Sequence, residues 1–155
     1  MNRFTTLTLM TLALLPALGL AHTPENEMPE AAKAAAATVD RFFAALSTGK
    51  LDKASAELDP DVIVLESGSV ERSAAEYLGG HAKGDAEFLK GVQQKLLSRT
   101  AKVSAELAWV ASESELQVQK DGKPVTILST ETMVLRLTDA GWKIVHIHWS
   151  SRTRK

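Results

Sequence analysis

The spacing of apolar residues changes once along this chain, and this change limits the folds that the chain can form. In the first half, apolar residues recur three and four positions apart, which predicts amphipathic helices. The two stripes are Val39, Phe42, Phe43, Leu46 and, further along, Phe88, Leu89, Val92, Leu96. From Thr100 onward apolar and polar residues alternate, which predicts strands that bury one face. The first alternating set is Val103, Ala105, Leu107, Trp109.

Turn signals connect these strands in sequence. Asp121-Gly122 predicts a two-residue hairpin turn, and residues 139–141 predict a three-residue turn. A short buried strand is predicted earlier, at residues 62–65. Helices first and hairpins second predict an α+β fold, with N-terminal helices packed on an antiparallel sheet.

The composition excludes several classes of protein. The chain has 155 residues, of which 45% are hydrophobic, enough to form one globular domain. It has no cysteine, which excludes disulfide frameworks, thiolate zinc sites and cysteine nucleophiles. Its 18 basic residues against 19 acidic ones give no basic surface for nucleic acid. We expect no cofactor and no nucleic-acid partner.

Residues 1–21 predict a secretory signal peptide. Arg3 supplies a positive start, residues 4–15 are uncharged and largely apolar, and small residues, Gly19 and Ala21, precede the expected cleavage site. We therefore expect an exported protein, periplasmic or secreted, that does not insert in the membrane after cleavage. Residues 22–29 are expected to form a flexible lead-in, residues 30–152 a single domain and residues 153–155 a basic tail.

The register of the last hairpin decides which side chains share a face. A three-residue turn pairs Thr138 with Trp142 and places Glu131 opposite Trp149, which separates apolar from polar side chains. A slipped register would instead place Glu131 opposite His148 and mix the two faces. We expect the register that separates them.

Glu131 then lies on the apolar face that the helices cover. Burial raises the pKa of a carboxyl group, which suits acid/base catalysis or ligand binding. The alternative is a structural hydrogen bond with Tyr77, Ser129 or Arg136.

The order of these elements and two sequence motifs resemble those of the nuclear transport factor 2-like superfamily. The motifs are residues 66–72, which lead into Tyr77 and His81, and residues 141–151, GWKIVHIHWSS. The chain is most similar to the SnoaL-like, DUF4440-type exported members. The resemblance implies a strongly curved sheet, a cone or half-barrel in a cystatin-like arrangement, with a pocket and a homodimer through the outer sheet face.

The same superfamily includes enzymes, such as ketosteroid isomerase and scytalone dehydratase, and scaffolds, such as the association domain of the calcium/calmodulin-dependent kinase. The isomerase requires a tyrosine and two aspartates in its pocket, and that set cannot be placed in this sequence. The dehydratase requires a His/Asp pair, which His81 and Asp85 match only by residue type. The resemblance therefore assigns no activity.

Two groups of residues are candidates for a pocket. Tyr77 and His81 lie four apart on one helical face, His81 as an acid/base and Tyr77 as a hydrogen-bond donor. Trp109, Ser129 and Trp149 are expected to line the pocket. The alternatives are a half-buried tyrosine, a surface histidine and tryptophans that belong to the core.

His146 and His148 lie on one strand face, which we expect to be a dimer face. This spacing also occurs in metal sites, but a third ligand is missing, so no metal site is expected. His22, at the expected mature N-terminus, is a further metal-binding candidate.

Three functions remain open. The first is binding of a small hydrophobic organic ligand without turnover. The second is a lyase or isomerase in which Glu131 or His81 is the acid/base and Tyr77 orients the substrate. The third is a metal-handling protein. The enzyme is favoured if Glu131 and His81 reach one cavity, and this form of the hypothesis fails if they lie on separate surfaces.

Overall fold

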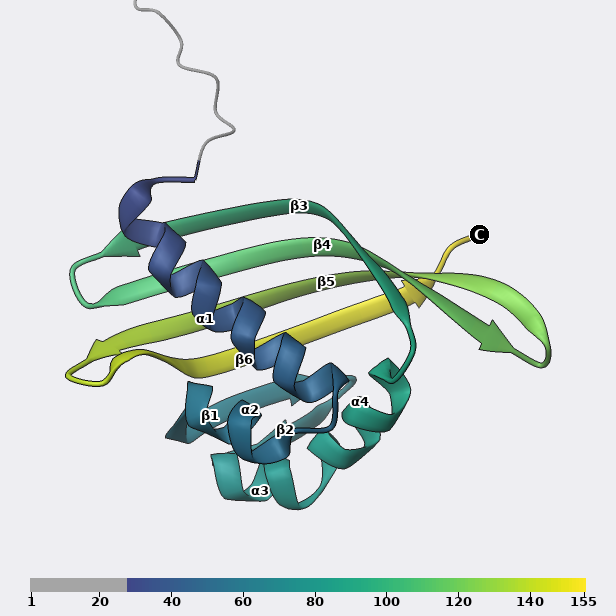
Figure 1. Ribbon diagram of the computed structural model, residues 1–155, viewed down its shortest axis with the longest axis horizontal. Helices are drawn as coiled ribbons and strands as arrows, with labels where there is room; N and C mark the ends of the chain where they lie inside the picture. The colour runs from purple at the N-terminus through teal and green to yellow at the C-terminus, as the bar shows by residue number, and fades with distance from the viewer. Residues whose placement is uncertain (1–27) are drawn as a thin grey trace, which may run out of the picture.

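The computed structural model describes residues 28–155, so the predicted signal peptide and His22 lie outside the described residues. Helices and strands follow one another in the order shown in Figure 1. They are α1 Glu30–Ser47, α2 Leu51–Glu57, β1 Leu58–Glu66, β2 Ser69–Glu71, α3 Ala74–Gly79, α4 His81–Leu89, β3 Gln93–Ser104, β4 Leu107–Lys120, β5 Lys123–Thr138 and β6 Gly141–Thr153. The predicted α+β fold, helices packed on a curved sheet, is confirmed.

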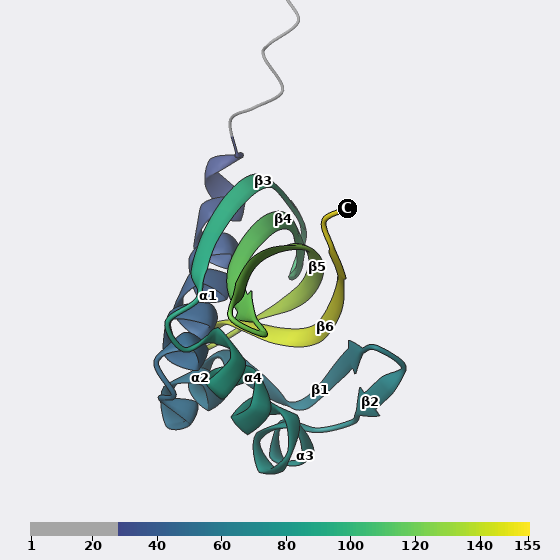
Figure 2. The same ribbon diagram turned by 90° about the vertical axis from the view of Figure 1, so that its right-hand side faces the viewer.

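The sheet has six strands in the order β2-β1-β6-β5-β4-β3. Strands β3 to β6 form an antiparallel meander that curls strongly, as Figure 2 shows from the end. The expectation of a purely antiparallel sheet is wrong, because β1 pairs with β6 in parallel. Parallel neighbours need a long connection, and here α3, α4 and the four strands β2 to β5 lie between the two.

Helix α1 crosses the inner face of this sheet, which we define as the face that carries Met133, Leu135 and Ile147 (Figure 1). Its buried stripe consists of Ala32, Ala35, Val39, Phe42 and Leu46. The buried residues near its start are alanines, whereas Phe42 and Leu46 are the large side chains that it buries near its end. The opposite face is the outer face.

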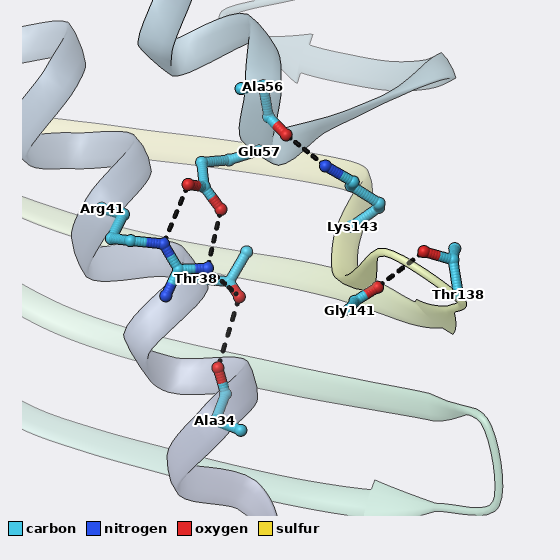
Figure 3. Close-up of polar contacts among 8 residues, drawn as sticks. All are labelled: Ala34, Thr38, Arg41, Ala56, Glu57, Thr138, Gly141 and Lys143. Carbon is cyan, nitrogen blue, oxygen red and sulfur yellow. Dashed lines mark hydrogen bonds and ion pairs between the residues drawn. The ribbon is translucent and has the colours of Figure 1, made fainter.

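A bidentate ion pair fixes α2 against α1. Arg41 donates from Nε and Nη2 to the two carboxylate oxygens of Glu57, both at 2.8 Å (Figure 3). The same guanidinium donates to Thr38 at 2.9 Å. Lys143 of β6 donates to the carbonyl oxygen of Ala56 at the end of α2. These contacts orient the chain as it enters β1.

Two short helices follow the small β1–β2 hairpin. Ser73 caps α3 by accepting a hydrogen bond from the backbone N–H of Glu76 at 3.1 Å. Helix α3 ends at Gly79, and the single residue Gly80 separates it from α4. The expected helical stripe does not extend past Leu89, because Gly91 adopts φ +75° and the chain continues as β3. A register shift between Leu96 and Ser98 interrupts the alternation of β3 and hides the strand in the sequence.

The last hairpin combines both registers considered from the sequence. Its turn has two residues, so Thr138 pairs with Gly141 and the expected pairing with Trp142 is wrong. Next, Ile144 and His146 pair with adjacent residues of β5, which leaves Val145 without a partner in a β-bulge. Beyond the bulge the expected register holds, and Glu131 faces Trp149.

No helix within residues 28–155 is both long enough and apolar enough to cross a bilayer.

Candidate functional site

Successive rows of side chains cross the inner face of the sheet, and they change from apolar to polar along the strands. The apolar row joins Val64, Ile147, Met133, Val110 and Ala101 on five neighbouring strands, and each is at most 3% exposed. This row belongs to the same hydrophobic core as the buried stripe of α1.

The next row brings charge to the same face. Glu66 pairs with Trp149, Trp149 with Glu131, Glu131 with Ser112 and Ser112 with Arg99. Trp149 thus lies between two acidic residues in this row. Arg99, at the far end of the row, donates to Asp40 of α1 at 2.6 Å.

A third row consists of serines. Ser151, Ser129 and Ser114 occupy the inner face of β6, β5 and β4. Because serine is small, this row leaves space between the sheet and the helices. Ser114 accepts a hydrogen bond from the side chain of Gln94 at 3.2 Å.

The space above these rows is a cavity of about 80 Å³. Helices α1 and α4 cover it with Phe43, Leu46, Asp85, Phe88 and Leu89. From the sheet it is lined by Glu66, Gln94, Ser112, Ser114, Leu116, Ile127, Ser129, Glu131, Trp149 and Ser151. Phe88, 48% exposed, is the most exposed of the large apolar residues in this lining. The cavity is therefore lined by both apolar and polar side chains, with seven aromatic or aliphatic residues and eight polar ones.

Glu131 is the most deeply buried of the cavity carboxylates, at 8% exposed. Its Oε2 accepts a hydrogen bond from Nε1 of Trp149 at 3.2 Å. Burial raises the pKa of Glu131, and the hydrogen bonds from Ser112 and Trp149 offset only part of this effect. Glu131 can therefore hold a proton at a higher pH than an ordinary glutamate.

A second carboxylate, Asp85, enters the cavity from α4. The hydroxyl of Tyr77, a fully buried side chain, donates to Oδ2 of Asp85 at 2.8 Å. Burial raises the pKa of Asp85, and the hydrogen bond from Tyr77 lowers it in part. Burial also raises the pKa of Glu66, as does the negative charge of Asp85. The carboxyl groups at this end of the cavity thus oppose one another's ionisation.

His81 lies outside the cavity lining. Its side chain is 51% exposed and its Nδ1 pairs with Oε1 of the buried Glu71. This hydrogen bond to Glu71 raises the pKa of His81. The other carboxylate oxygen of Glu71, Oε2, is buried and has no hydrogen-bond partner among the described residues. Glu131 and His81 therefore do not reach the same cavity.

Tyr77 contributes to the aromatic wall behind the cavity. Its ring lies 6.2 Å from that of Trp149 and 6.5 Å from that of Phe42, between ring centroids. The structure thus joins Tyr77 to the site through Asp85 and Trp149.

Trp109 does not line the cavity, and the expectation that it faces inward is wrong. It lies on the outer face, 38% exposed, and the ammonium group of Lys102 lies 6.0 Å from its ring centroid. The alternation from Val103 to Trp109 is not one strand, since a turn at Ala105, φ +52°, separates β3 from β4. Because this turn reverses the chain, Ala108 shares the inner face with Val103, and Trp109 lies on the outer face.

His146 and His148 lie on the outer face, opposite Val134 and Thr132 of β5. Burial lowers the pKa of His146, as does the neighbouring charge of His148. Within residues 28–155 no group of three or more histidine or acidic side chains is arranged to hold a metal ion.

Comparisons with known proteins identify the family. Residues 35–153 match the family model described as the SnoaL-like domain. The chain belongs to this family. A comparison with curated proteins finds no match.

Solved structures with the same fold carry different descriptions. A candidate ketosteroid isomerase from Shewanella frigidimarina NCIMB 400 is 35% identical to this SnoaL-like domain, covering 76% of this chain and 94% of that chain, with a TM-score of 0.72. The CaMKII hub of S. rosetta is 23% identical, covering 80% and 98%, with a TM-score of 0.66. An NTF2-like protein with a cystatin-like fold from Novosphingobium aromaticivorans is 16% identical, covering 76% and 79%, with a TM-score of 0.64.

Sequence reasoning missed several residues of this SnoaL-like site. Glu66 lies one position past the strand expected at residues 62–65, because the strand is longer than its apolar run. The signal for Ser112 and Ser114 was present: they occupy alternate positions where buried strands normally carry apolar residues. Asp85 was noted only by residue type, since its position depends on how α4 packs.

Proposed function

We propose that this protein binds a small organic molecule in the cavity between α1, α4 and the inner face of the sheet. The observation that carries the proposal is the composition of this cavity. Aromatic and aliphatic side chains form walls beside convergent hydrogen-bonding groups, and small-molecule sites generally combine these two kinds of surface. The volume of about 80 Å³ is below the roughly 300 Å³ typical of sites for drug-sized ligands, which favours a compact ligand.

The test uses two of the protein's own tryptophans as reporters. Trp149 lies in the cavity and Trp109 on the outer face, so their indole N–H signals in a ¹H–¹⁵N spectrum report separately. We would titrate a library of small organic fragments and expect binders to shift the Trp149 signal alone.

Two variants of β5 test whether binding occurs in the cavity. Ser129→Leu fills the serine row, whereas Thr132→Leu adds the same side chain on the outer face. We expect binding to be lost in Ser129→Leu and retained in Thr132→Leu. The proposal is wrong if no fragment shifts Trp149, or if Ser129→Leu leaves every binder unaffected.

A second candidate function is proton transfer at a carbon next to a carbonyl group. It is favoured by cavity carboxyl groups with raised pKa, Asp85 beside Tyr77 above all, and by the 35% identity to a candidate ketosteroid isomerase. The small cavity suits a compact ketone better than a four-ring steroid.

Exchange of the α-hydrogens of cyclohexanone for deuterium, followed by NMR in D₂O, tests this activity. The base removes a proton from carbon, and deuterium from solvent replaces it. We expect Asp85→Asn to abolish protein-dependent exchange and His81→Ala to retain it, since His81 lies outside the lining. Absence of exchange above the buffer rate excludes this function for that ketone and leaves the binding function standing.

We also propose a homodimer through the outer face. A row of Trp109, Val134, His146 and Ile63 crosses four strands there, and Trp109 and Ile63 are 38% and 43% exposed. Such a stripe favours burial against a second copy. Sedimentation should show a dimer for the native chain and a monomer for Trp109→Glu. A monomeric native chain contradicts this proposal.

Export is a further proposal, supported by the pattern of residues 1–21. Expression in a bacterial host, followed by mass spectrometry of the periplasmic protein, should show a chain that begins at or near His22.

A further inference from the structure

We propose that the ligand of the cavity carries a positive charge, as a protonated organic amine with a compact apolar body. This inference rests on the proposed binding function and specifies its ligand class. It follows from the charges of the lining, the pairing of the carboxylates and the aromatic surfaces beside them.

The charges of the lining have one sign. Glu66, Asp85 and Glu131 enter the cavity from β1, α4 and β5, and none of the lining residues in the described part of the chain is basic. Glu71, behind them, leaves Oε2 buried and without a partner among the described residues. Buried carboxylates are normally paired with cations or held by several hydrogen bonds.

Two basic groups whose charges act on these carboxylates, Arg99 and His81, have other partners. Arg99 donates to Asp40 at 2.6 Å and to Ser112 at 3.0 Å. His81 pairs with Glu71 and is half-exposed, away from the lining. The described residues thus leave the negative charge of the cavity without a cation inside it.

The hydrogen bonds of the carboxylates are also incomplete. Asp85 accepts one hydrogen bond, from Tyr77 at 2.8 Å through Oδ2. Glu131 accepts two, from Trp149 at 3.2 Å through Oε2 and from Ser112. An ionised carboxylate can accept about four hydrogen bonds, and an ammonium group has three N–H donors and no acceptor. An ammonium group therefore matches the acceptors that remain.

The aromatic rings suit the same ligand. Trp149 lies between Glu66 and Glu131 on the sheet, and Phe43 and Phe88 cover the cavity from the helices. Cations are attracted to the faces of aromatic rings, and most strongly to tryptophan. An apolar body attached to the ammonium group would contact the remaining rings and the serine row.

Three probes of similar shape and different charge test whether charge determines binding. Benzylammonium, benzyl alcohol and benzoate share a ring and carry charges of +1, 0 and −1. Dissociation constants at pH 7 are measured from the Trp149 indole signal, with Trp109 as the internal control. We expect benzylammonium to bind at least tenfold more tightly than benzyl alcohol and benzoate to bind weakest.

Variants assign the effect to the cavity carboxylates. Asp85→Asn should weaken benzylammonium at least fivefold and leave benzyl alcohol unchanged, and Glu66→Gln provides the same test if Asp85→Asn fails to fold. Glu113→Gln removes an exposed carboxylate of β4 outside this cavity, and should change neither probe.

The outcomes distinguish this inference from the proposed function. Benzyl alcohol binding as tightly as benzylammonium overturns the positive charge but supports a ligand site in the cavity. Equal loss of both probes in Asp85→Asn overturns it as well, since the carboxylate then acts by shape. If none of the probes shifts Trp149, the inference is wrong, and the fragment library with Ser129→Leu decides the proposed function separately.

Discussion

Truncation of Ile147 tests which face of β6 the helices cover. Ile147 is fully buried in the apolar row, next to the cavity floor. Ile147→Ala removes three carbon atoms, worth about 2.4 kcal/mol at roughly 0.8 kcal/mol each. The cavity left behind adds to this cost, so we expect a loss of about 3–4 kcal/mol in the free energy of unfolding. Ile147→Val, which removes one carbon, should cost about 1 kcal/mol.

Urea unfolding followed by circular dichroism measures these losses, and the melting temperature of Ile147→Ala should fall by roughly 10 °C. His148→Ala is the matched control, because the adjacent side chain is exposed on the outer face. We expect it to change the free energy by less than about 0.5 kcal/mol. If His148→Ala costs as much as Ile147→Ala at several protein concentrations, the register beyond the bulge is wrong, and with it the position of Glu131.

Three further predictions concern titratable groups. Burial raises the pKa of Glu131 above its ordinary 4.5, so the folded protein favours the neutral form of this side chain. The stabilisation that comes from binding this proton is complete below pH 4.5. It is lost as pH rises through the folded-state pKa, and the free energy of unfolding falls. Glu131→Gln should therefore stabilise the protein more at pH 7 than at pH 4 in urea unfolding, and equal effects would contradict this. Tyr77→Phe removes the hydrogen bond to Asp85, so the pKa of Asp85 should rise further in a ¹³C carboxyl titration and stability should fall by about 1 kcal/mol. His81 should titrate above its ordinary pKa of 6.5 by ¹H NMR, and Glu71→Gln should return its midpoint toward that value.

The spacing of apolar residues predicted the helices and the sheet of this fold, but it did not predict correctly which face of every strand is buried. Helix α1 and the strands β4 to β6 follow from spacing and turn signals, because each buries one face along much of its length. The register shift in β3 hides that strand, whose first residues were expected to be helical. The hairpin turn at Ala105 carries no glycine or asparagine, so the sequence concealed it and Trp109 was assigned to the inner face. A single concealed turn was enough to reverse the strand that follows it.

Long-range pairing was the second limit. Glu131 was placed opposite Trp149 because both belong to one hairpin, whose register is a local property. Glu66 joins the same row only through the parallel pairing of β1 with β6. No local pattern specifies that pairing, so the second carboxylate beside Trp149 became visible only in three dimensions.

The parallel pairing of β1 with β6 also determines when the binding site can form during folding. Glu66 and Trp149 meet on adjacent strands although most of the domain separates them in sequence. Contacts this distant close large loops and form late in folding. A nascent chain that lacks its last strand therefore has no complete binding site, and proteolytic removal of β6 would abolish binding even where the N-terminal helices stay folded.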